Sequence, residues 1–259
     1  MKKWTSIKDS LPAPLFIILL IAAWEVITAA LDVPAYILPS PSAIATALNE
    51  NFFLLVEHSR ITMAAVLSGL LLAVIVALLL ALAMDRWQLL KQAFYPILVM
   101  SQAVPIFALA PLLLIWFGAG LLPKVLIVAL VCFFPLAVNL VEGFSQVDPE
   151  AVDLMKTMQA DRWLIMRSVQ FPSAMPYFFT GLKIAATYSV MGAIIGEWLA
   201  ARAGLGIYML RAMHSFRTSH LFAAIIVVIF LSLALFKLVD LGGWLAMPWQ
   251  RKTTESLKE

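Results

Sequence analysis

The residues that could do chemistry in this 259-residue chain are few, and most stand alone within long apolar stretches. Glu197 is an ionisable group at the end of one such stretch, where it either lines a path through the protein or forms a salt bridge with Arg202. Gln102, Asn139 and Tyr188 are uncharged polar residues inside other apolar stretches. Residues of this kind either contact a solute or hydrogen-bond to a neighbouring helix. These four residues are the candidate lining of a polar path, and they do not form a catalytic group.

Catalysis and metal binding by this chain alone are not expected. The histidines, His58, His214 and His220, are scattered without the spacing of metal ligands, and the single cysteine, Cys132, lies inside an apolar run. The sequence GxxxxGK followed by Ser or Thr, which marks a phosphate-binding loop, is missing. We therefore expect no catalytic residue, no metal site and no cofactor bound by this chain, so that any ATP-driven step needs another polypeptide.

The composition is that of a polytopic membrane protein. Hydrophobic residues make up 63% of the chain and charged residues 13%, with a mean hydropathy of +0.96. Soluble domains have roughly 45–50% apolar and about 25% charged residues, which argues against a globular enzyme. The net charge of +3 indicates no nucleic-acid partner, and the lipid bilayer is the expected environment. The expected fold class is therefore all-α integral membrane.

Six apolar stretches are candidates for helices that cross the hydrocarbon core. The third carries Gln102, Pro105 and Pro111, and it should therefore be bent or broken. We place the spans at about residues 14–31, 61–84, 94–117, 125–141, 177–199 and 221–245. An interfacial helix is expected at 43–55, and a short re-entrant or interfacial helix within 200–220.

These spans divide the chain into three parts. Residues 1–56 hold the N-terminal tail, the first span and an extracytoplasmic crossing, and residues 57–245 form the transmembrane core. Residues 246–259 are a charged tail that should be frayed.

Most of the 18 Lys and Arg residues fall in segments that are cytoplasmic if both termini are cytoplasmic. This bias predicts that both termini lie on the cytoplasmic side. The segment 148–172 then lies on the cytoplasmic side as well.

The segment 148–172 is neither membrane-like nor simply polar, and its pattern predicts a helical hairpin. Asp148 suits the N-cap of a first helix, with Pro149 in its first turn. Asp161 suits the N-cap of a second helix, which Pro172 should end. On this pattern alone the hairpin is either an amphipathic lid or surface loop, or a lever that docks into a partner.

The hairpin resembles the coupling loop of the permease subunits of binding-protein-dependent ABC importers. The pattern of that family is Glu-Ala-Ala, three residues, Gly, nine residues and Ile-x-Leu-Pro. Asp153 stands in place of the Glu, Gln159 in place of the Gly, and Pro172 in place of the Pro. Since Gly permits a positive φ, the turn here requires Gln159 to adopt left-handed geometry, or else it has a different shape.

The resemblance covers roughly residues 14–248. Residues 105–118, 178–185 and 192–198 are similar to permeases of the nitrate, taurine and aliphatic sulfonate importers, and 177–181 to those for pyrimidine precursors of thiamine. The implied fold is a six-span, type-1 permease like that of methionine importers, in the inner membrane of a prokaryote. The implied partners are a second copy of the chain, two copies of an ABC ATPase that carries ATP and Mg²⁺, and an extracytoplasmic solute-binding protein.

The resemblance also assigns roles to residues. Docking of the hairpin into the ATPase would involve Asp153, Met155, Gln159, Ala160 and Pro172, with Met158 and Trp163 as further anchors. Asp153 could instead only pair within the hairpin. Gln102, Asn139, Tyr188 and Glu197 would line the translocation pathway. The implied solute is a thiamine pyrimidine precursor, and the alternative is a sulfonate, taurine or nitrate. An ion-coupled secondary carrier is the other class considered, although the buried mid-span carboxylates that it needs are scarce.

Overall fold

The computed structural model describes residues 12–249, apart from the side chains of Ala13 and Ala200, and the regular structure in this part is entirely helical. Most of the predicted tail at 246–259 therefore lies outside the described residues. The elements are α2 (Pro12–Ala30), α3 (Pro41–Glu50), α4 (Phe52–Arg86), α5 (Gln88–Ser101), α6 (Ile106–Phe117), α7 (Leu121–Ser145), α8 (Pro149–Thr157), α9 (Arg162–Ile165), a π-helix (Met166–Gln170), α10 (Phe171–Ala200), α11 (Leu205–His214) and α12 (Thr218–Ala246).

Each predicted span has a helical counterpart. In the described part, α4, α7, α10 with the short helix before it, and α12 are long and apolar enough to cross a membrane. The third predicted span is the pair α5 and α6, which meet at a bend of 102°, so the predicted break is confirmed. The apolar helix at Pro14–Ala30 matches the first predicted span and is shorter than the others.

The predicted boundaries were less accurate than the predicted spans. The helix expected at 43–55 ends at Glu50, and α4 begins at Phe52, well before residue 61. Asp85 and Arg86, expected in a loop, lie in the last turn of α4, and only Trp87 separates α4 from α5. Hydropathy detects the part of a helix that crosses hydrocarbon, whereas the hydrogen-bonded helix continues into the polar layer.

The bundle is arranged around α7, which packs most extensively against α10 and α4. Small residues on α4 at every fourth position form a buried stripe toward the bundle; they are Ala65, Gly69, Ala73, Ala77 and Ala81. A Cβ added at Gly69 would lie 2.5 Å from the Cβ of Val128 on α7. Small residues thus allow the two helix backbones to approach closely.

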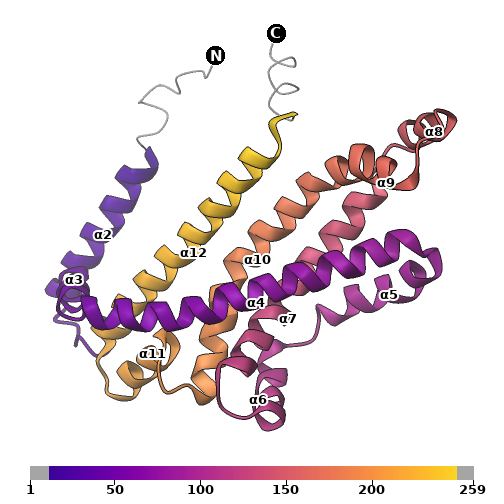
Figure 1. Ribbon diagram of the computed structural model, residues 1–259. Helices are drawn as coiled ribbons and strands as arrows, with labels where there is room; N and C mark the ends of the chain where they lie inside the picture. The colour runs from indigo at the N-terminus through magenta and orange to yellow at the C-terminus, as the bar shows by residue number, and fades with distance from the viewer. Residues whose placement is uncertain (1–11, 250–259) are drawn as a thin grey trace.

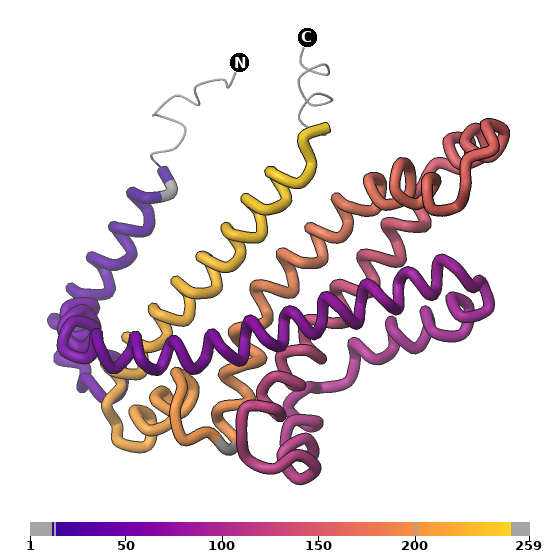
Figure 2. Tube along the Cα trace, in the orientation of Figure 1, coloured from indigo at the N-terminus to yellow at the C-terminus, as the bar shows by residue number. Residues whose placement is uncertain are grey.

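The two ends of the molecule carry different elements (Figure 1). The start of α2, the end of α12 and the hairpin that contains α8 lie at one end, while α3, α6 and α11 lie at the other. The Cα trace shows α4 running at a large angle to α2 and α12 (Figure 2). The hairpin is therefore far from α11, and the bundle separates them.

A buried polar network fixes the connection between α10 and α11. Glu197 is fully buried and accepts hydrogen bonds from the backbone N–H of Gly206 at 2.7 Å and from Thr62 Oγ1 at 2.9 Å. Thr62 Oγ1 in turn accepts the N–H of Leu205 at 2.9 Å. Gly204 has φ +130°, and a Cβ there would lie 2.2 Å from the Glu197 carboxylate. The loop thus depends on a carboxylate on α10 and a hydroxyl on α4.

We expect Thr62→Val to destabilise the protein, because it leaves the N–H of Leu205 without its acceptor and removes a donor to Glu197. An unsatisfied buried polar group costs about 1–3 kcal/mol, and the free energy of unfolding should fall by that amount. Thermal unfolding in detergent measures the change. Thr180→Val is the matched control, because its hydroxyl is exposed and bonds only to the Pro176 carbonyl of its own helix. Equal melting of the two variants would contradict the role given to Thr62.

Candidate functional site

Three of the polar residues selected from the sequence line one pocket. Gln102, Asn139 and Tyr188 come from the α5–α6 bend, α7 and α10, and they surround a space of about 500 Å³. Apolar side chains such as Phe134 and Val131 complete the wall. No charged residue is among those that line this pocket. We call it the amide pocket; its lining offers amide and hydroxyl groups beside aromatic and aliphatic side chains.

The backbone explains why these side chains meet. The bend between α5 and α6 is a run of turns, in which the N–H of Gln102 donates to the carbonyl of Val99, and Pro105 then begins α6 from an extended conformation. Asn139 Nδ2 donates to the carbonyl of Pro135 at 2.7 Å, which fixes the amide and leaves its carbonyl oxygen as an acceptor. Tyr188 is about half exposed, so its hydroxyl is accessible.

Glu197, the fourth predicted pathway residue, lies outside the amide pocket. Its carboxylate bonds to Thr62 and Gly206, and not to Arg202, which was one of the two alternatives that the sequence left open. Neither of the two ion pairs found in the described part of the chain includes it. The sequence could not identify Thr62 as its partner, because the two residues are 135 positions apart and no local pattern links them.

The structure confirms the predicted caps and turn of the hairpin at 148–172. Asp148 Oδ1 accepts the N–H of Glu150 at 2.9 Å, and Asp161 Oδ1 accepts the N–H of Leu164 at 2.8 Å. Gln159 has φ +56°, and the N–H of Ala160 donates to the carbonyl of Met155 at 3.0 Å. A non-glycine residue thus adopts the left-handed conformation at the position where the family pattern has Gly.

The hairpin exposes several large apolar side chains. Leu154 is 61% exposed, and Met158 and Trp163 are each 70% exposed. Met155, one of the predicted anchors, is only partly exposed, and Leu154 is an exposed apolar residue that the sequence analysis did not select. Asp153 is exposed and forms an ion pair with Lys156 at 2.8 Å. Apolar side chains grouped on an element beside polar ones are typical of a protein-binding surface.

The prediction that Pro172 ends the second helix was wrong. The helix widens into the π-helix at Met166–Gln170 and continues directly into α10, with Pro172 in its first turn. In the π-helix the N–H of Phe171 donates to the carbonyl of Met166, five residues earlier. Proline lacks the N–H and crowds the carbonyl four residues before it, and a π turn accommodates both defects. Sequence periodicity does not distinguish this from a helix end.

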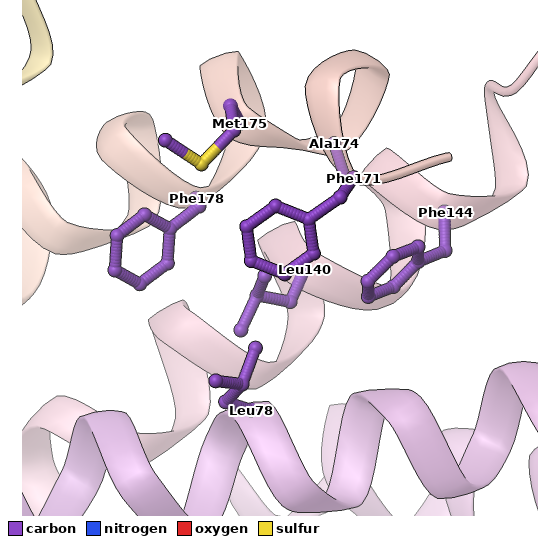
Figure 3. A pocket seen from close by; sticks show the side chains of 7 residues that line it. All are labelled: Leu78, Leu140, Phe144, Phe171, Ala174, Met175 and Phe178. Carbon is purple, nitrogen blue, oxygen red and sulfur yellow. The ribbon is translucent and has the colours of Figure 1, made fainter. Parts of the chain in front are cut away.

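An apolar cavity of about 220 Å³ lies beneath this junction (Figure 3). Phe171, Ala174, Met175 and Phe178 of α10 line one side of it. Leu78 of α4, with Leu140 and Phe144 of α7, completes the wall. All seven side chains that line this cavity are apolar.

An all-helical apolar bundle with a broken span, a neutral pocket and an exposed hairpin at one end has the construction of a membrane permease. The chain belongs to the family of binding-protein-dependent transport system inner membrane components, whose model matches residues 69–242. It is therefore a permease of an ABC importer, and it is not an enzyme.

Two relatives and one solved structure give the context. The chain is 35% identical over 247 residues to the formylaminopyrimidine transport permease protein ThiX of Halalkalibacterium halodurans, covering 94% of this chain and 98% of that one. It is 36% identical over 245 residues to the riboflavin transport system permease protein RibX of Chloroflexus aurantiacus, covering 93% and 91%. The inward-facing MetNI methionine ABC transporter matches with a TM-score of 0.60 at 17% identity, over 74% of this chain and 97% of that one. The expected type-1 permease fold is confirmed.

We expect Gln159→Val to loosen the turn of the hairpin, because a β-branched residue is disfavoured at positive φ by about 1–2 kcal/mol. Hydrogen exchange at the N–H of Ala160 should then accelerate about tenfold. Met158→Val is the matched control, since Met158 is an exposed neighbour with φ −78°. Unchanged exchange in Gln159→Val, or equal acceleration in both variants, would contradict the strain assigned to Gln159.

Proposed function

We propose that two copies of this chain form the translocation pathway of an ABC importer in the inner membrane of a prokaryote, with all termini cytoplasmic. The family implies an ATPase and a solute-binding protein as partners. We further propose that the complex contains two copies of the ATPase and that ATP and Mg²⁺ bind to the ATPase rather than to this chain. The bias of Lys and Arg supports this orientation, as does the position of α8 at the same end as the start of α2 and the end of α12.

The hairpin at 148–172 is the proposed coupling element. Its exposed Leu154, Met158 and Trp163 offer an apolar surface that an ATPase subunit would cover. Asp153 would exchange its exposed pairing with Lys156 for a contact with the partner. Met155, Gln159, Ala160 and Pro172 would shape the hairpin and join it to α10.

The proposed solute is a pyrimidine precursor of thiamine, of the formylaminopyrimidine type. The observation that carries this choice is the neutral amide pocket, where Gln102, Asn139 and Tyr188 can hydrogen-bond to a flat nitrogen heterocycle. The identity of 35% to a formylaminopyrimidine permease supports it. A sulfonate, taurine or nitrate is disfavoured, because no cationic residue lines the pocket. An ion-coupled carrier is disfavoured because no carboxylate lines it.

Riboflavin is the second candidate. The relative named for riboflavin transport is 36% identical to this chain, and the isoalloxazine ring has an edge of carbonyl and N–H groups to which amide and hydroxyl side chains can also hydrogen-bond. The pocket volume of about 500 Å³ admits a solute of either size, so the uptake measurement, rather than the volume, distinguishes the two candidates.

Coupling is tested by Asp153→Arg in proteoliposomes that contain the chain, its ATPase and its binding protein. The reversed charge should repel the partner surface that accepts Asp153, so uptake should fall about tenfold while ATP hydrolysis continues. The measured quantity is solute taken up per ATP hydrolysed. Glu50→Arg is the matched control, since Glu50 is an exposed acid on α3 at the other end of the molecule. Normal uptake by Asp153→Arg would contradict the coupling role of the hairpin.

The solute is tested in the same proteoliposomes with labelled formylaminopyrimidine, riboflavin and taurine. We expect uptake of formylaminopyrimidine, reduced about tenfold by Asn139→Leu or Tyr188→Leu, with binding to the solute-binding protein unchanged. Thr187→Val, an exposed neighbour of Tyr188 outside the pocket, should transport normally. Uptake of taurine alone, or full activity of both pocket variants, would contradict the proposal.

A further inference from the structure

A second polar pocket lies at the end of the molecule opposite the hairpin. It has a volume of about 260 Å³ and is enclosed by the start of α4, by α11 and by the turn that leads into α12. Its walls include Arg211, Arg217, His58, His220 and Tyr208. No acidic residue is among those that line it. We call it the arginine pocket, and the amide pocket shares no residue with it.

The turn between α11 and α12 places Arg217 at this pocket. Phe216 has φ +55°, which is uncommon for a bulky residue. The N–H of Arg217 donates to the carbonyl of Ala212 at 2.9 Å, and the N–H of Phe216 donates to that of Met213 at 3.1 Å. These bonds to a left-handed residue are a common way to end a helix, and they fix the backbone that carries Arg217.

The pocket presents donors rather than acceptors. His58 Nδ1 accepts the N–H of Gly204 at 2.8 Å, so Nε2 carries the proton in the neutral ring. Arg211 Nη2 donates to the carbonyl of Arg202 at 3.2 Å, and its other N–H groups are not used by this bond. Within residues 12–249, the Arg217 guanidinium has no hydrogen bond or ion pair.

The charged side chains that line the pocket are both positive, and the nearby acid Glu57, which acts on His58, is not part of the lining. Burial raises the pKa of Tyr208, and the positive charge of Arg217 opposes that rise only in part. The phenol therefore stays protonated at neutral pH, with its oxygen 3.1 Å from His220 Nδ1. Arg211 places a second positive charge near His58. Two guanidinium groups converge on one concave site without a carboxylate in its lining, and an anion there would relieve their repulsion.

We propose that the arginine pocket binds an oxyanion of the phosphate class, either free phosphate or the phosphodiester of a phospholipid headgroup. The planar guanidinium fork matches phosphate oxygens in a bidentate manner, and His58, whose Nε2 carries the proton, is a further donor in the lining. Beside the pocket, Phe53 is 86% exposed and Phe216 is 73% exposed. Exposed apolar rings next to a cationic site suit contact with lipid chains below an anionic headgroup, so the phospholipid headgroup is the second source of the phosphate.

The test uses the purified transporter, with its ATPase, in two binding measurements. Equilibrium binding of ³²P-labelled orthophosphate measures the free-anion source. Native mass spectrometry of the delipidated complex, with phosphatidylglycerol compared with a diacylglycerol of the same chains, measures the headgroup source. Arg217→Gln and Arg211→Gln remove one charge each. Arg60→Gln is the matched control, because Arg60 is an exposed arginine on α4 that does not line this pocket.

We expect saturable binding of orthophosphate or selective retention of phosphatidylglycerol, weakened at least about tenfold by either pocket variant and unchanged by Arg60→Gln. Both arginines are exposed, and unchanged thermal unfolding would show that the variants fold. Binding of neither probe to the unmodified protein would overturn the proposal. Arg217→Gln that binds either probe as tightly as the unmodified protein would also overturn it. The same holds if Arg217→Gln changes only the affinity of the transporter for its solute-binding protein. None of these results depends on the solute or the coupling role proposed above.

Discussion

The close approach of α4 and α10 to α7 is the constraint on which the rest of the structure depends. Lipid offers no hydrophobic advantage to helix contact, so van der Waals packing between small residues has to hold the bundle together. Because Gly69 of α4 has no side chain, Val128 can pack against it on one side of α7. Gly181 of α10 likewise leaves room for the Cβ of Asn139 on another side of α7. The second contact places Asn139 beside the pocket that Tyr188 also lines. The contacts that hold the bundle together therefore also set the shape of the pocket.

A single helix connects the hairpin with the pocket. The π-helix keeps the chain helical across Pro172, so that Phe171 at the base of the hairpin and Tyr188 at the pocket lie on the same rigid element, about 25 Å apart along its axis. The apolar cavity under Phe171 leaves room for side chains at the base to rearrange while the glycine contacts of α10 hold its middle. The hairpin and the pocket are thus joined by a continuous helix, with Pro176 between them.

The sequence predicts this fold well wherever the determining physics is local. Hydrocarbon requires long apolar helices, so the spans could be located from hydropathy, and the caps Asp148 and Asp161 follow from side-chain chemistry within three residues. Gln102, Asn139 and Tyr188 were selected because polar side chains are rare in such stretches, and the structure brings them together. The role of Glu197 and the continuation past Pro172 were not predictable, because they depend on a distant threonine and on a change of helical pitch.

The bonding of Glu197 has a consequence for the order in which the chain acquires its structure. During synthesis from the N-terminus, Thr62 and His58 emerge long before Glu197 and the loop at 204–206. The carboxylate and the loop N–H groups become satisfied together only when α10 settles against an α4 that is already in place. Until then the carboxylate and the three backbone donors need water as their partner, because leaving them unsatisfied in hydrocarbon costs several kcal/mol. Completion of this network therefore marks the point at which the two halves of the bundle become one folded unit.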